Sequence, residues 1–328
     1  MRIGATQLFF PEKSVAESLA YAKATGYESL ELCVNQEAEL KPDSDEAAVR
    51  AMRREADRLG MAIPSLVPRE CQGFASPDAA VRARALEVLR VSIRFAALLG
   101  ADTILVHPGQ LTPQVRYDVM YANFREALRQ AAPAAERAKV AVGVENVWNK
   151  FLLSPLEAQR FIEEVGSASV GIYFDVGNFV PWAYPEQWIS MLGRGIKKVH
   201  FKDFKRKAHQ FVPLLEGDVD WPAVMQALRG IGYESDVIQE VAGDEAGMRA
   251  TAEAMRKILA TVVPMSAQDF FVEYIALGRA GDKAGLRELM HKQVRCPACN
   301  AVVDGIRTVT ADAGLACPEC QRVWMQYR

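Results

Sequence analysis

Four residues that can ligate a metal ion each lie at the end of a short segment expected to be a strand. They are Glu145 after "VAVGV", Asp175 after "VGIYF", His200 after "IKKV" and Glu240 after "VIQ". A charge beside an apolar run is costly unless it is paired or bound to a cation. Three clustered carboxylates would repel one another, and a divalent cation removes that conflict. Although a single acid at a strand end is more often a helix cap or ion-pair partner, the set of four predicts a metal site. Its oxygen-rich composition suits Mn²⁺ or Mg²⁺, and also Co²⁺ or Zn²⁺.

A second group of ligand-type residues lies near the C-terminus. Cys296 and Cys299 form one CxxC pair, and Cys317 and Cys320 form another after seventeen intervening residues. This spacing is typical of a zinc ribbon, in which four thiolates surround one Zn²⁺ tetrahedrally. Four sulfur ligands leave no open coordination position. We therefore expect a structural Zn²⁺ there rather than a catalytic one.

The elements that must carry the first group alternate regularly along the chain. Apolar runs expected to be strands lie at 2–7, 29–34, 62–68, 102–109, 140–147, 170–178, 196–203 and 236–241. Segments with helical periodicity separate them, including 14–27, 79–101, 221–233 and 244–263. Eight such units in about 250 residues predict an α/β (β/α)₈ TIM barrel, whose active site lies at the carboxyl ends of the strands. A doubly wound open sheet is the rival fold, but no GxGxxG turn follows the first strand.

The regular alternation of strand-like and helical segments stops after Pro264. We expect the TIM barrel over residues 1–264, a short helical connector over 265–292 and a zinc ribbon over 293–328. The ribbon is expected to be an appended C-terminal module and not a ninth barrel unit.

The segments "VENVWN", "YFDVGN", "VHFKD" and "IQEV", with "EGDVDWPAVMQALRGIGY", resemble the sugar phosphate isomerase/epimerase family. These are xylose isomerase-like barrels that include ketose 3-epimerases and L-ribulose-5-phosphate 3-epimerases. The resemblance implies that Glu145, Asp175, His200 and Glu240 hold one divalent cation. It also implies an isomerase that inverts C3 of a ketose or ketose phosphate through an enediolate. Glu145 and Glu240 would then be the catalytic acid/base pair on opposite faces of the substrate.

Several residues near these strand ends are expected to bind substrate. Arg206 and Lys202 lie in the basic stretch "KDFKRKAH", where barrels often hold phosphate, and related epimerases carry an arginine at the position of Arg206. His107 and Trp148 follow other strands, and each has an ordinary structural interpretation as well. Asn178 stands where free-ketose 3-epimerases have a histidine, so the chain resembles the L-ribulose-5-phosphate 3-epimerase branch most closely.

Composition limits the other function classes. The 328 residues are 50% hydrophobic with a formal net charge of −2, which gives no global reason to expect a nucleic-acid partner. The chain has no apolar run of the roughly 18 residues that a membrane span needs, and its start makes a poor signal peptide, so a cytoplasmic protein is expected. An endonuclease IV-like repair enzyme shares the barrel but uses many histidines, whereas this chain has only His107, His200, His209 and His291.

Three alternatives stay open at this stage. An aldose–ketose isomerase or a dehydratase would use the same barrel and metal, and a non-catalytic or nucleic-acid-associated protein would use the ribbon. The expected partner is a small sugar or sugar phosphate. Family resemblance further implies a homo-oligomer, either a dimer or a tetramer.

Overall fold

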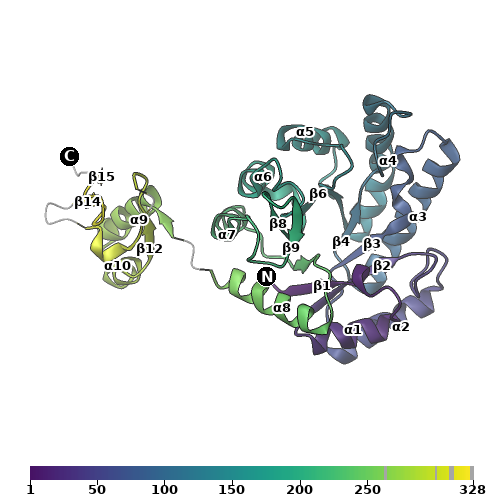
Figure 1. The fold of residues 1–328 in the computed structure, drawn as a ribbon, viewed down its shortest axis with the longest axis horizontal. Coiled ribbons are helices and arrows are strands. Elements are labelled where there is room, and N and C mark those ends of the chain that lie inside the picture. The colour runs from purple at the N-terminus through teal and green to yellow at the C-terminus, as the bar shows by residue number, and fades with distance from the viewer. Residues whose placement is uncertain (262–263, 300, 310–313, 326–328) are drawn as a thin grey trace. The chain divides into compact units, whose positions relative to one another are not determined.

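Eight parallel strands close into a barrel in the N-terminal part of the chain (Figure 1). The computed structural model describes residues 1–261, 264–299, 301–309 and 314–325. The barrel strands are β1 (Ile3–Thr6), β2 (Ser29–Val34), β3 (Ser65–Pro68), β4 (Thr103–Val106), β5 (Ala141–Glu145), β6 (Val170–Asp175), β7 (Ile196–Phe201) and β10 (Val237–Gln239). Each pairs with the next in this order, and β10 closes on β1. The predicted (β/α)₈ barrel is confirmed.

Helices follow the strands and cover the outside of the barrel (Figure 1). They are α1 (Val15–Ala24), α2 (Glu46–Leu59), α3 (Ala79–Leu99), α4 (Tyr117–Ala138), α5 (Pro155–Val165), α6 (Pro185–Leu192), α7 (Trp221–Gly230) and α8 (Glu245–Leu259). Short 3₁₀ helices lie at Gln7–Phe9, Arg69–Ala75 and Gly193–Gly195. Local sequence fixes several helix ends: Ser14 and Glu17 form a capping box at α1, and Gly60 and Gly100 end α2 and α3 in the left-handed conformation.

The period-two geometry of strands puts alternate residues inside the barrel. Ile238, Leu105, Val67 and Tyr173 pack together there as an apolar cluster. Gly143 on β5 leaves room for Tyr173, because a Cβ at position 143 would lie 2.9 Å from the Tyr173 Cβ. Residues two positions further along β5, β6 and β10 therefore point inward at the carboxyl end, where active sites of such barrels lie.

The C-terminal part forms a second compact unit over Thr261–Arg328. It contains α9 (Ala267–Ala280), α10 (Lys283–Met290), a three-stranded sheet of β11 (Met265–Ser266), β12 (Gln293–Arg295) and β13 (Val302–Asp304), a 3₁₀ turn at Gly305–Arg307, and the pair β14 (Leu315–Ala316) and β15 (Val323–Met325). Phe270 of α9 and Leu289 of α10 share a core with Val294 and Leu315. The helices α9 and α10 therefore pack against β12 and β14, the strands that directly precede Cys296 and Cys317. The predicted division into three modules stays a prediction.

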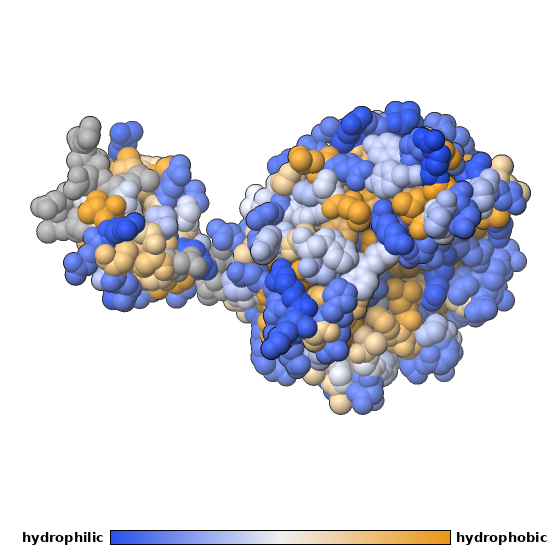
Figure 2. Space-filling view, turned by 45° about the horizontal axis from the view of Figure 1, so that its top comes forward, coloured by the Kyte–Doolittle hydropathy of each residue, from blue (hydrophilic) through white to orange (hydrophobic). Residues whose placement is uncertain are grey.

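The surface of the barrel unit mixes polar and apolar residues. Figure 2 shows apolar patches between polar side chains on the visible face. In the part of the chain that the structure describes, no helix is long and apolar enough to cross a membrane.

Candidate active site

The four predicted metal ligands lie together at the carboxyl end of the barrel. One ligand atom each from Glu145, Asp175, His200 and Glu240 lies within 4.8 Å of all the others. Glu145 ends β5, Asp175 ends β6, His200 lies in β7 and Glu240 directly follows β10. The side chains of Asp175 and His200 are fully buried, while that of Glu240 is 16% exposed. These adjacent strands thus build one compact group of three carboxylates and an imidazole.

Asp175 is fixed by two asparagines. The side chain of Asn146 bridges β5 and β6: its Oδ1 accepts from the Asp175 N–H (2.7 Å) and its Nδ2 donates to the Asp175 carbonyl (2.8 Å). The backbone N–H of Asn178 donates to Asp175 Oδ1 (2.8 Å). Asp175 Oδ2 is buried and has no hydrogen-bond partner among the described residues. One oxygen therefore orients the carboxylate, and the other is left for a ligand.

The sequence "DVGN" allows this arrangement because Gly177 has no side chain. A Cβ at position 177 would come within 2.9 Å of the Lys202 backbone carbonyl carbon and oxygen. The turn after β6 can therefore pack directly on the turn after β7.

His200 contacts a fourth carboxylate that the strand-end argument missed. Its Nε2 lies 3.1 Å from Oε1 of Glu31, a fully buried residue of β2. Its Nδ1 faces the other way, 3.4 Å from Glu240 Oε2 and 3.8 Å from Glu145 Oε1. This Nδ1 is buried and lacks a hydrogen bond within the described chain. The sequence does contain a signal for this residue, because Glu31 is the one charged residue in the apolar run "SLELCV".

The crowded charges shift one another's pKa. Burial raises the pKa of Asp175 well above its ordinary value, and Lys202 only partly opposes this. Burial alone would lower the pKa of His200, but Glu31 and the neighbouring carboxylates outweigh it and hold the pKa well above its usual range. Burial would raise the pKa of Glu240, yet hydrogen bonding to His200 and the charge of Lys202 keep it low. The site therefore retains protons that a bound cation would displace.

The donor set fits a divalent cation. Three carboxylates and one imidazole nitrogen match the ligands of Mn²⁺ and related ions. The two unpartnered atoms, Asp175 Oδ2 and His200 Nδ1, are also atoms that such an ion would bind. A buried polar atom without a partner is costly, so both observations favour a ligand at this point.

Comparison with known proteins agrees with the fold. A family model described as the xylose isomerase-like TIM barrel matches residues 19–258. The chain belongs to this xylose isomerase-like family. The L-ribulose-5-phosphate 3-epimerase UlaE of Salmonella paratyphi A is 29% identical over 222 residues, which cover 66% of this chain and 78% of that protein. The predicted resemblance to this family and to its L-ribulose-5-phosphate 3-epimerase members is confirmed.

Solved structures with the same fold include sugar epimerases. D-psicose 3-epimerase from Clostridium cellulolyticum H10 superposes with a TM-score of 0.67 at 16% identity, over 80% of this chain and all of that one (100%). A D-tagatose 3-epimerase-like protein superposes with a TM-score of 0.69 at 21% identity, over 79% of this chain and 97% of that one. At these identities the likeness concerns the fold.

In this member of the xylose isomerase-like family, Lys202 lies beside the proposed ligands. Its Nζ is 3.1 Å from Glu240 Oε2 and 3.9 Å from Asp175 Oδ2, and it sits 4.3 Å from the centre of the Phe211 ring. A cavity of about 380 Å³ opens next to it, lined by Phe9, Lys202, Phe211, Val212, Pro213, Glu240, Val241 and Ala242. Lys202 is therefore placed between the carboxylates and an open, largely apolar space.

Arg206 is engaged with backbone groups. Its Nε donates to the Val180 carbonyl (2.8 Å), and its two terminal nitrogens donate to the carbonyls of Ala183 (3.2 Å) and Asp218 (3.3 Å). The guanidinium thus ties the β8–β9 hairpin (Asp203–Lys205 and Gln210–Val212) to the loop after β6. Its predicted contact with substrate stays a prediction.

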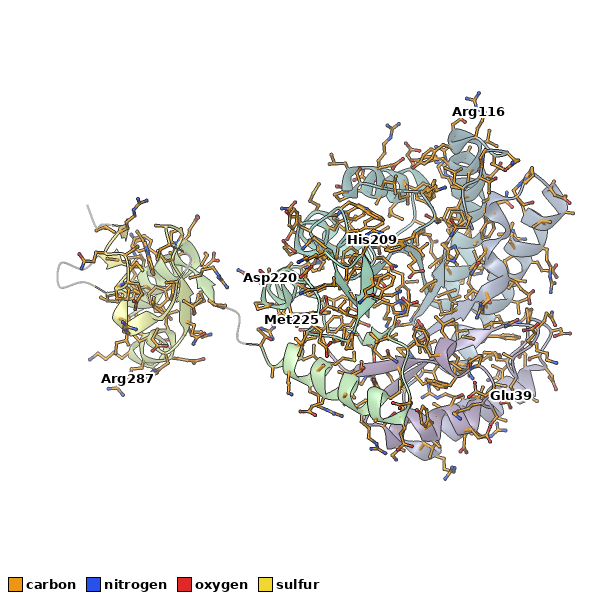
Figure 3. All side chains as sticks on the ribbon, viewed as in Figure 1. Glu39, Arg116, His209, Asp220, Met225 and Arg287 are labelled. Carbon is orange, nitrogen blue, oxygen red and sulfur yellow. The ribbon has the colours of Figure 1, made fainter. Side chains whose placement is uncertain are left out.

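The same hairpin meets an aromatic group near the end of β5. The Trp148 ring lies 5.1 Å from Phe211 and 5.8 Å from His209, measured between ring centres. Trp148 Nε1 also donates to the Asn178 carbonyl (2.5 Å). Figure 3 labels His209 on this hairpin. It also shows Arg116 extending outward at the start of α4. Trp148 and Asn178 are therefore brought together, and Asn178 Nδ2 is buried without a partner in the described ranges.

His107 follows β4 at the same end of the barrel. Its Nδ1 accepts the backbone N–H of Gly109 (3.2 Å). Burial lowers the pKa of His107, although the charges of Glu145 and Glu240 oppose the shift. This favours a neutral imidazole near the two glutamates, and its predicted contact with substrate is untested.

The four C-terminal cysteines also come together. Their sulfur atoms lie within 4.8 Å of one another, with 3.8 Å between Cys296 and Cys320 and 3.7 Å between Cys299 and Cys317. Burial would raise the pKa of Cys296, but N–H donors including that of Cys299 lower it to about 6. This set suits Zn²⁺, which binds thiolates tetrahedrally.

Proposed function

We propose that this protein is a divalent-metal-dependent 3-epimerase acting on a ketose or a ketose phosphate. The observation that carries the proposal is the joint placement of Glu145, Asp175, His200 and Glu240, with Asp175 Oδ2 and His200 Nδ1 buried and unpartnered among the described residues. The similarity to L-ribulose-5-phosphate 3-epimerases supports this reaction and favours a phosphorylated substrate. The proposed cation is Mn²⁺ or Mg²⁺, and Co²⁺ and Zn²⁺ are the alternatives.

The four residues would hold the cation. When bound, it would supply positive charge that stabilises the enediolate formed as C3 of the substrate loses its proton. Glu145 and Glu240 come from β5 and the end of β10, separated in the barrel by β6 and β7. Two glutamates on different sides of the mouth can serve opposite faces of a planar intermediate. One removes the C3 proton as general base, and the other returns a proton to the other face.

The remaining mouth residues would orient the sugar. Lys202 is placed to bind a substrate oxygen beside Glu240, and the apolar wall at Phe211 would cover the sugar's C–H face. We propose His107, Asn178, Trp148 and Arg206 as further substrate contacts. For Asn178 the support is the buried Nδ2, which would donate to a substrate oxygen.

Hydrogen exchange tests the reaction. The Mn²⁺-loaded protein is incubated in D₂O with candidate ketoses and ketose phosphates, and the products are analysed by NMR. Deuterium at C3 is expected, whereas deuterium at C1 or C2 would indicate an aldose–ketose isomerase. Exchange with none of the candidates, in fully loaded protein, would contradict both reactions.

Glu145→Gln and Glu240→Gln test the assignment of the bases. Each should reduce exchange by about 10²–10⁴-fold, the usual contribution of a general acid or base. Metal content is measured in parallel, because both residues are also proposed ligands. Wild-type exchange rates in both variants would refute the assignment.

We also propose one structural Zn²⁺ bound by Cys296, Cys299, Cys317 and Cys320. The support is the closeness of the four sulfur atoms and the CxxC spacing. Cys296→Ser should remove one equivalent of zinc and leave the barrel metal in place. Trp324 offers a fluorescence readout, because its Nε1 lies 3.2 Å from Cys296 Sγ. Unchanged zinc content in Cys296→Ser would contradict the proposal.

A further inference from the structure

A buried hydrogen-bond network lies beneath the proposed metal ligands, and Glu31 is its centre. Glu31 is fully buried inside the barrel on β2. Its Oε2 accepts from Ser65 Oγ (2.7 Å) and Tyr173 OH (2.5 Å), and its Oε1 lies 3.1 Å from His200 Nε2. The four residues come from β2, β3, β6 and β7, so the network crosses the barrel interior.

The contact with Glu31 decides which nitrogen of His200 carries hydrogen. An ionised carboxylate only accepts hydrogen bonds, so the nitrogen that faces Glu31 must be the donor. Nε2 therefore carries the hydrogen, and in the neutral ring Nδ1 presents its lone pair. That lone pair points to the side where Glu145 Oε1 (3.8 Å) and Glu240 Oε2 (3.4 Å) lie.

Glu31 is itself held in place from the opposite side. The Ser65 and Tyr173 hydroxyl oxygens are 3.2 Å apart, and both contact the same Glu31 oxygen. The Tyr173 ring also packs against His200, with 4.6 Å between ring centres. Glu31 and the Tyr173 ring together fix the position and angle of the imidazole.

We propose that Glu31 is the positioning residue of the metal centre. It holds His200 in the tautomer and orientation that make Nδ1, and not Nε2, the metal ligand. This inference rests on the proposed function, since it assumes a cation at the four-residue site. Carboxylates that orient ligand histidines typically change metal affinity 10- to 100-fold when they are replaced.

The test compares two variants that alter the same network. Glu31→Gln keeps the size of the side chain but lets an amide nitrogen face His200, which disfavours the Nε2–H tautomer. Tyr173→Phe is the matched control, because it removes a different partner of Glu31 and leaves the contact with His200. Mn²⁺ affinity is measured by calorimetry, and thermal stability is measured on the metal-free proteins.

Glu31→Gln should weaken Mn²⁺ binding about 10- to 100-fold. Tyr173→Phe should bind Mn²⁺ nearly as tightly as the wild type, even if its melting temperature falls. A merely structural role for Glu31 would lower the melting temperature without this selective loss of affinity. Wild-type affinity in Glu31→Gln would overturn the inference and leave the proposed reaction intact.

NMR of the wild-type protein keeps the inference testable if Glu31→Gln does not fold. With ¹⁵N-labelled histidine and Zn²⁺ in the barrel site, His200 should show a protonated Nε2 and a metal-bound Nδ1. Metal on Nε2 would overturn the inference. Failure of the wild type to bind any divalent ion would refute both proposals, whereas metal binding without deuterium exchange would refute only the reaction.

Discussion

Asp203 offers the sharpest test of how the mouth of the barrel is held together. Its fully buried carboxylate accepts four N–H groups: Phe204 N (2.9 Å) and Val219 N (3.3 Å) at Oδ1, and Leu215 N (3.0 Å) and Trp221 Nε1 (3.0 Å) at Oδ2. One side chain thereby anchors the whole segment from the β8–β9 hairpin to the start of α7. The perturbation we consider is Asp203→Asn.

The size of the effect follows from these contacts. Asparagine has nearly the same volume, but only one of its two terminal atoms accepts hydrogen bonds. Two of the four donors would therefore face an NH₂ group. Each buried donor left unpaired costs about 1–3 kcal/mol, so the segment should lose about 2–6 kcal/mol. At about 2–4 °C per kcal/mol for a domain of this size, the melting temperature should fall by about 4–24 °C.

The assay is thermal unfolding followed by circular dichroism, with Asp118→Asn as the matched control. Asp118 is an exposed residue that pairs with Arg116 (2.8 Å), so the same chemical change there should alter stability little. Asp203→Asn should also show faster proteolysis within 204–220, because the anchored segment would open first. A melting temperature equal to that of the wild type would refute the reasoning.

Three further predictions concern the barrel unit. Asp102→Asn should lower the free energy of unfolding, measured by urea titration, by about 2 kcal/mol, because the fully buried Lys198 loses the carboxylate whose Oδ1 lies 2.7 Å from its Nζ. The loss should be smaller than for a fully buried ion pair, because Asp102 is half-exposed. Gly143→Ala should cost about 1–3 kcal/mol by the same measurement, because the new Cβ would press on Tyr173. An unchanged urea midpoint in either variant would contradict the packing described. Mn²⁺ affinity should increase as the pH rises, because the pKa values of Asp175 and His200 are raised and both groups must lose their protons to bind the ion. Calorimetry in buffers of different ionisation enthalpy should show proton release, and its absence would count against the site.

The main features of the fold and the site could be predicted because they depend on local patterns. Apolar runs that end in Glu145 and Asp175 give both the strand and the direction of the acid, since parallel strands in a barrel share one carboxyl end. Alternation along a strand then determines which side chains point inward. No knowledge of which strands touch was needed to expect the ligands to meet.

Contacts between distant segments could not be predicted in this way. Glu31 and His200 are 169 positions apart, and their pairing depends on the closed order of the barrel strands and on the depth of each residue within it. Arg206 shows the same limit. Its place in a basic stretch predicts a substrate contact, whereas its three hydrogen bonds to backbone carbonyls exist only because two loops pack together.

Lys198, His200 and Lys202 lie two positions apart, in β7 and just after it. Their different partners suggest which residues of this barrel serve stability and which serve function. Lys198 pairs with Asp102 on the amino-terminal side, His200 contacts Glu31 in the middle, and Lys202 reaches Glu240 at the carboxyl end. Substitutions at the first level remove a buried charge partner and should affect stability alone. Substitutions of Lys202 or Glu240, at the carboxyl end, change charged groups that can also pair with a bound ligand. They should therefore affect binding more than folding. Glu31 lies between these levels, which is why metal affinity, and not melting temperature, is the measurement that reports its role.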